Sequence, residues 1–185
     1  MLKNFIFLIV LFLPLKSSYS QTAKKNPAGT MQVGVARVDI TPSDPIRLTG
    51  YAARGKQEAT QVLSRLSAKA LAFGSTPKQT SLLITVDLVG INWRVTSQVV
   101  EKLSKKTGLD PAQIAVCASH THGSPEVGNL INILQCRGDY PANFYFNESL
   151  MDLDELVHIA QFSEQLVDKL VEVSMAALNN RKPSL

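Results

Sequence analysis

The spacing of hydrophobic residues predicts strands in the first half of the chain. Residues 32–40 alternate roughly between apolar and polar side chains and end at a Thr-Pro pair, which predicts a strand closed by a turn. Residues 67–73 predict a second strand. Residues 80–89 are apolar and β-branched apart from Asp87, a pattern expected of a strand that is buried on both faces.

The helical period follows twice in the later part of the chain. Residues 92–107 place apolar side chains on one face and are followed by Gly108, which predicts a helix stopped by that glycine. The apolar run at residues 114–118 predicts the next strand. Strand, helix and strand in this order form a βαβ unit, whose strands are parallel and whose crossover is right-handed. Residues 152–178 predict a long amphipathic helix.

Together these elements predict an α/β fold with a mixed or partly parallel sheet and flanking helices. Residues 43–60 and 123–147 show neither period and predict long loops. The aromatic side chains of the second loop either line a pocket for an acyl chain or anchor the loop to the core. No internal repeat or low-complexity segment is present in the sequence.

Composition is that of a globular protein rather than a disordered one. The 185 residues are 45% hydrophobic and 18% charged, enough to form one domain with a substantial core. The net charge of +4 is modest, and its lysines and arginines are scattered without interleaved aromatics. We therefore expect no nucleic-acid partner.

The first twenty residues resemble a secretory signal peptide. Lys3 precedes an apolar run at residues 5–15, and small residues lead to a cleavage point after Ser20. The run is shorter than the ~20 residues that a membrane-spanning helix needs. We expect a secreted or periplasmic protein with residues 1–20 removed, a polar linker at residues 21–30, and a folded domain at residues 31–185.

Export makes the two cysteines relevant. An oxidising compartment permits a disulfide between Cys117 and Cys136. Cysteine also packs well in sheet cores, so a buried free Cys117 fits the sequence equally. Both readings stay open.

His120 and His122 are the candidates for chemistry. They stand one residue apart just after the predicted strand at residues 114–118, and alternate side chains of an extended segment share a face. Both rings can therefore enter one cleft. Imidazole is a frequent zinc ligand and titrates near neutral pH, which favours a metal-assisted or acid/base site. The same pair also fits a surface turn in which both rings only bond to backbone groups.

Asp87 and His158 are the other polar residues considered. The carboxyl ends of parallel strands meet at one edge of a sheet, so Asp87 is expected near the two histidines, where a carboxylate orients a metal-bound ring. Asp87 equally suits a capping or turn role before the helix that starts near Asn92. His158 lies within the predicted late helix and is expected to be partly exposed or hydrogen-bonded, not a ligand.

Five short motifs occur in order along the chain and resemble the N-terminal part of the neutral/alkaline (non-lysosomal) ceramidase family. The motifs are VARVDITP at residues 35–42, GYA at 50–52, AKAL at 68–71, VDLVG at 86–90 and SHTH at 119–122. The resemblance implies a secreted, zinc-dependent amidase that cleaves the N-acyl bond of ceramide. It places the zinc on His120 and puts His122 against the carbonyl or oxyanion of the substrate.

The chain departs from the family pattern in two ways. The usual Ser-Gly-Pro after the second histidine is Gly123-Ser124-Pro125 here, followed by Glu126, so the expected substrate is ceramide or a related lipid amide. The family also continues further, with a second ligand histidine, an arginine, a glutamate, a tyrosine and a catalytic serine. We therefore expect an incomplete N-terminal portion of a larger catalytic domain, inactive alone.

Two other functions remain as alternatives. One is an exported binding or structural domain without enzymatic activity, and the other is a hydrolase of other amides or esters on the same scaffold. A serine hydrolase is not expected, because the sequence has no Gly-x-Ser-x-Gly motif. Contact with a membrane surface is compatible with a lipid substrate. The sequence leaves the oligomeric state open.

Overall fold

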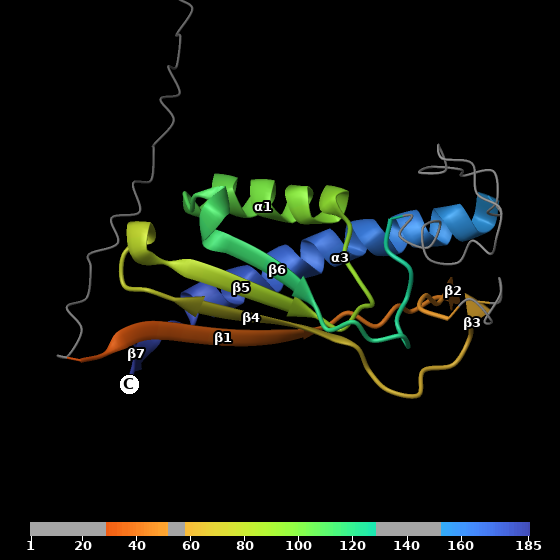
Figure 1. Ribbon diagram of the computed structural model, residues 1–185, viewed down its shortest axis with the longest axis horizontal. Helices are drawn as coiled ribbons and strands as arrows, with labels where there is room; N and C mark the ends of the chain where they lie inside the picture. The colour runs from red at the N-terminus through yellow and green to blue at the C-terminus, as the bar shows by residue number, and fades with distance from the viewer. Residues whose placement is uncertain (1–28, 52–57, 129–152) are drawn as a thin grey trace, which may run out of the picture.

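Five strands form one mixed sheet in a computed structural model that describes residues 29–51, 58–128 and 153–185 (Figure 1). The strand order is β6-β5-β4-β1-β7, and only β5 and β6 are parallel to each other. These strands are β1 (Met31–Asp39), β4 (Ser67–Phe73), β5 (Ser81–Val86), β6 (Ile114–Ala118) and β7 (Lys182–Ser184). The predicted α/β class with a mixed sheet and flanking helices is confirmed.

The other elements within the described ranges are two long helices, two short helical turns and a small second sheet. The helices are α1 (Trp93–Thr107) and α3 (Leu153–Asn179), and the turns are η2 (Pro77–Gln79) and η3 (Pro111–Gln113). Strands β2 (Ile46–Arg47) and β3 (Glu58–Ala59) pair antiparallel to form the second sheet. They lie inside residues 43–60, which were predicted to be a loop. The sequence did not indicate them because two-residue strands leave no periodic pattern.

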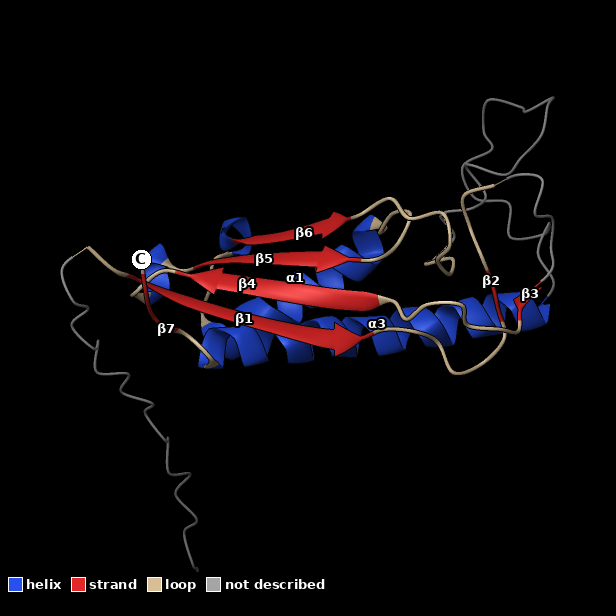
Figure 2. Ribbon diagram, turned by 90° about the horizontal axis from the view of Figure 1, so that it is seen from below, coloured by secondary structure: helices blue, strands red, loops and turns tan. Residues whose placement is uncertain are grey.

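Both helices lie on the same face of the main sheet, and the strands lie in front of them when the molecule is seen from below (Figure 2). The core sits between these two layers. Every second side chain of β4 and β5 is buried there, namely Ala68, Ala70, Ala72, Leu82, Ile84 and Val86. Fully buried leucines of the helices, such as Leu103 and Leu170, pack in the same cluster. Burial of each large side chain contributes about 1.5–3 kcal/mol.

The opposite face of the sheet is uncovered in the described part of the chain. Val35 is 64% exposed there, and Thr85 of β5 is exposed as well. The prediction that residues 80–89 form a strand buried on both faces is therefore wrong: the strand is shorter and has one covered face. Apolar residues on the open face, such as Leu83, made the sequence look like that of an interior strand.

Cys117 belongs to the exposed residues of β6. Its side chain is exposed and has no disulfide partner within the described residues, so the alternative of a buried Cys117 is wrong. Cys136 lies outside the described residues, and the proposed disulfide stays a prediction. The same holds for the signal segment at residues 1–20 and for the aromatic side chains at residues 140–146. No helix within the described ranges is long and apolar enough to cross a membrane.

Capping residues set both ends of α1, and the sequence indicated only the second of them, Gly108. The side chain of Asn92 accepts a hydrogen bond from the Val95 amide at 3.0 Å, which starts α1. Gly108 ends the helix with a φ of 73°, a conformation that glycine adopts without steric cost. Helix α3 is described from Leu153 and ends at Asn179, one residue later than the predicted end.

Candidate functional site

The two histidines follow the parallel strands β5 and β6. Backbone pairing between the two segments continues past the strands: the Ser119 amide donates to the Val86 carbonyl at 3.0 Å, and the Thr121 amide donates to the Leu88 carbonyl at 3.1 Å. The turn that carries the histidines is therefore fixed against the segment that leaves β5. This is the edge at which α/β sheets bind ligands.

The rings of His120 and His122 meet. Their Nε2 atoms are 3.3 Å apart, and the ring centroids are 4.9 Å apart in an edge-to-face arrangement. The spacing predicted this convergence, although not the backbone that produces it. His120 has a φ of 61°, a left-handed conformation that is unfavourable for a residue with a Cβ, rather than an extended one.

A backbone carbonyl orients the ring of His120. Its Nδ1 lies 2.7 Å from the carbonyl oxygen of Val89. A carbonyl oxygen only accepts hydrogen bonds, so the bond assigns the hydrogen to Nδ1 and leaves the lone pair on Nε2. An imidazole with this arrangement is prepared to bind a metal through Nε2, because its other nitrogen is already held.

Asp87 does not take part in this contact. Its carboxylate accepts hydrogen bonds from the amide and the hydroxyl of Ser67, at 3.0 and 2.7 Å. The carboxylate thus ties the end of β5 to the start of β4, and the cap of α1 is Asn92. The predicted contact between Asp87 and the histidines is wrong, because both hydrogen bonds of this carboxylate come from Ser67 in β4, the antiparallel neighbour of β5.

His122 is seated against a glycine and an aromatic ring. Gly50 has a φ of 108°, and a Cβ built on it would lie 2.6 Å from Cγ of His122. The ring of Tyr51 packs against the ring of His122, with a centroid distance of 4.7 Å. Only glycine fits this backbone and this distance. The Gly-Tyr pair stood in the motifs of the sequence, but nothing there indicated its contact with His122.

A short antiparallel pairing between residues 47–49 and residues 124–126 supports the histidine turn. The Thr49 amide donates to the Ser124 carbonyl, and the Glu126 amide donates to the Arg47 carbonyl, both at 3.0 Å. Four polar residues are buried in this pairing, namely Arg47, Thr49, Ser124 and Glu126. The loop that contains residue 50 is thereby fixed to the histidine turn. Sequence reasoning missed this contact, since the two segments are far apart along the chain.

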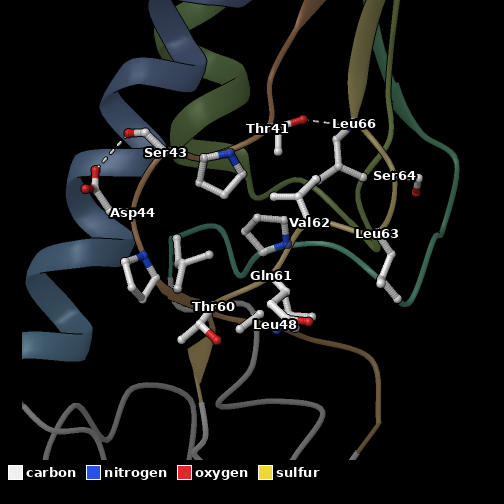
Figure 3. Close-up of a pocket in the computed structure, with 16 residues that line it drawn as sticks. Thr41, Ser43, Asp44, Leu48, Thr60, Gln61, Val62, Leu63, Ser64 and Leu66 are labelled. Atoms are coloured by element: carbon white, nitrogen blue, oxygen red, sulfur yellow. Dashed lines mark hydrogen bonds between the residues drawn. The ribbon is translucent and has the colours of Figure 1, made fainter.

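A cavity of about 310 Å³ lies beside the turn (Figure 3). Gly123 and Pro125 contribute to its wall, together with segments 41–48 and 59–66. The wall is largely apolar, with the side chains of Leu48, Val62, Leu63 and Leu66 around the space in Figure 3. The histidine rings do not line this cavity, so it does not confirm the cleft that was predicted in front of both rings.

The described residues do not form a complete metal site. No group of three or more His, Cys, Asp or Glu side chains in residues 29–51, 58–128 and 153–185 is placed to hold a metal ion. Zinc usually takes three or four protein ligands, and the histidine pair offers two. The orientation of the pair fits zinc binding, but two ligands are too few to complete a zinc site.

His158 belongs to a different environment, as expected. Its Nδ1 lies 2.8 Å from a carboxylate oxygen of Glu58, which joins α3 to β3. The hydrogen bond to Glu58 raises the pKa of His158 above its usual value. This ring forms a structural ion pair when protonated.

Comparison with known proteins decides the family. The sequence profile of the family described as neutral/alkaline non-lysosomal ceramidase, N-terminal, matches residues 31–136. The chain belongs to this family. It therefore contains a ceramidase-like domain, from a family of amidohydrolases. No curated protein matches the chain at a significant level.

Solved structures of ceramidases share the fold. The neutral ceramidase from Pseudomonas aeruginosa is 19% identical, with a TM-score of 0.62 over 83% of this chain and 22% of that chain. A structure described as ceramidase complexed with C2 is also 19% identical, with a TM-score of 0.61 and the same shares of the two chains. The chain thus spans about a fifth of the length of these proteins.

Proposed function

We propose that this domain supplies the first part of a zinc-dependent active site that hydrolyses the N-acyl amide bond of ceramide or a related lipid amide. The supporting observation is the histidine pair at the ends of β5 and β6. The Val89 carbonyl leaves the lone pair of His120 on Nε2, and Nε2 of His122 lies 3.3 Å away. Membership of the ceramidase family supplies the reaction class.

The two histidines have different roles in this proposal. His120 would hold the zinc ion, which when bound lowers the pKa of a water ligand to about 7 and polarises a carbonyl group. His122 would donate a hydrogen bond to the substrate oxygen as negative charge develops on it. Gly50 and Tyr51 hold that ring in place, which avoids reorganisation during the reaction.

The cavity in Figure 3 supports a substrate with a hydrocarbon chain. Its wall shares Gly123 and Pro125 with the segment that follows His122, so an apolar chain in the cavity would start beside the histidines. Leu63 at this cavity is 97% exposed and Val62 is 56% exposed. Exposed apolar side chains beside a lipid site favour contact with a membrane surface.

His120 alone does not complete a zinc site, so we expect the remaining ligands to come from residues outside the described ranges or from further polypeptide. We therefore expect the 185-residue chain to bind zinc weakly and to be inactive alone. Export to the periplasm or the exterior belongs to the same proposal, and the pattern of residues 1–20 supports it.

Calorimetric titration of the chain with zinc tests the proposal. Wild-type chain should take up zinc, and His120→Ala should lose at least tenfold in affinity, because the oriented ligand is removed. His158→Ala is the matched control, since its ring is bonded to Glu58 and should leave the affinity unchanged. Zinc uptake that is absent in the wild type, or equal in all three chains, would contradict the proposal.

A further inference from the structure

Ser124 is a buried hydroxyl behind the histidine turn. Its side chain is fully buried, with a relative exposure of 0%. The Oγ accepts a hydrogen bond from the Val89 amide at 2.9 Å and donates one to the Thr121 carbonyl at 3.0 Å. One hydroxyl thus connects the segment after β5 to the turn after β6.

The partner of this hydroxyl is the residue that orients His120. The amide of Val89 bonds to Ser124, and the carbonyl of Val89 accepts the hydrogen bond from Nδ1 of His120 at 2.7 Å. Val89 is 5% exposed, so water does not readily replace the Ser124 hydroxyl as partner of the amide. A buried amide without an acceptor costs about 1–3 kcal/mol, and the segment would shift to find one.

We infer that Ser124 is a positioning residue for His120. Its hydroxyl holds Val89 where the carbonyl selects the tautomer of His120 with hydrogen on Nδ1, and this keeps the lone pair of the ring on Nε2, the atom that would bind a ligand. The assignment of zinc as that ligand rests on the proposed function. The tautomer itself is a property of the metal-free chain and is measured without zinc.

Nitrogen-15 NMR of the histidine rings provides the test. The full chain is labelled on histidine and kept metal-free at a pH at which the rings are neutral. His122→Asn and His158→Asn assign the remaining signals to His120. Wild-type protein should show hydrogen on Nδ1 of His120 and a slowly exchanging Val89 amide. A wild-type ring with hydrogen on Nε2 would overturn the inference without any variant of Ser124.

Ser124→Ala removes the hydroxyl and should give a mixture of tautomers at His120, with zinc affinity about tenfold lower than in the wild type. Ser124→Thr keeps a hydroxyl and should restore a single tautomer. Ser174→Ala is the matched control, because Ser174 is also fully buried and its hydroxyl donates to the Leu170 carbonyl at 2.6 Å, in α3. Ser174→Ala should change neither the tautomer of His120 nor the zinc affinity.

The outcomes separate the two proposals. A folded Ser124→Ala chain that retains the single Nδ1-protonated tautomer would overturn the inference, whatever its zinc affinity. If Ser124→Ala does not fold, the inference is tested by the other two chains: both the wild type and Ser124→Thr should show the single tautomer with hydrogen on Nδ1, and failure of either would overturn it. Absence of zinc binding by a wild-type chain with the expected tautomer would contradict the proposed function and leave the positioning role intact.

Discussion

The structure holds two kinds of histidine, and their partners distinguish them. At the ends of β5 and β6, His120 bonds to the neutral carbonyl of Val89 and turns its other nitrogen toward His122. On α3, His158 bonds to the carboxylate of Glu58. A carbonyl orients a ring without adding charge, whereas a carboxylate favours the protonated ring, which has no lone pair for a metal.

Residue type alone therefore does not identify a histidine that could bind a metal. Both rings are partly accessible to solvent, and both are held by a hydrogen bond to Nδ1. The His120 region combines a neutral partner, a second ring within hydrogen-bonding distance and a position at the open edge of parallel strands. The His158 region has none of these, and its pair instead joins β3 to α3.

The largest expected effect comes from a change that displaces His122. Gly50→Ala would place a Cβ 2.6 Å from that ring on a backbone with a φ of 108°, so both the ring and the loop must move. We expect the free energy of unfolding to fall by about 2 kcal/mol or more, the order of cost for such backbone strain. Chemical denaturation measures the loss, and the NMR signals of the His122 ring report the displacement.

Gly123→Ala is the matched control for this change. Gly123 follows His122 directly, but a Cβ built there meets nothing within 4 Å and the backbone has no positive φ. Its stability should stay within about 0.5 kcal/mol of the wild type, as for exposed substitutions. Equal losses in both variants would show that the contact between residue 50 and His122 does not hold the ring.

A smaller effect is expected at Asp87, which the structure separates from the histidines. Asp87→Ala removes the acceptor of two hydrogen bonds from Ser67 and should lower the free energy of unfolding by about 1–2 kcal/mol. Zinc affinity should not change beyond what this loss of stability explains. A folded variant with tenfold weaker zinc binding would show that Asp87 does contribute to the histidine site, contrary to what its bonds to Ser67 indicate.

The sequence predicted the elements of this fold better than their surroundings. Residues 67–73 and 114–118 form strands with the predicted bounds, because hydrophobic period and turn residues are local signals. The open face of β5 was not predictable, since the same apolar residues fit an interior strand and an uncovered one. The burial of a strand depends on which layers pack against the sheet, and the sequence of one strand does not reveal those layers.

The candidate site was predictable to a similar extent. Histidines at positions i and i+2 after a strand were recognised from residue type and spacing alone. Their supports were not: Gly50 reaches the turn through pairing between segments more than seventy residues apart, and Ser124 bonds to the amide of Val89, which lies 35 residues away. The orienting carbonyl of Val89 belongs to the backbone, so no side-chain pattern reveals it. Asp87 was misplaced because the sequence does not show that Ser67 lies beside it.

The smallest expected effect concerns the pH dependence of stability, which separates the two histidine regions directly. The hydrogen bond that His158 donates to Glu58 raises the pKa of His158 in the folded chain, and the charges of Asp154 and Asp44 act in the same direction. A group whose pKa is raised by folding stabilises the folded state fully below its unfolded pKa. That contribution is lost as pH rises through the folded pKa.

Thermal unfolding of the wild type across the range from weakly acidic to weakly alkaline pH should therefore show a small decrease in Tm above the usual histidine pKa. His158→Gln keeps most of the side-chain volume and should flatten this part of the curve, as should Glu58→Gln, since either removes one partner of the pair. Both pair members are partly exposed, so the shift should be modest. A variant curve parallel to that of the wild type would mean that the β3–α3 pair carries no charge in the folded protein, and the contrast between a charged and a neutral partner would fail.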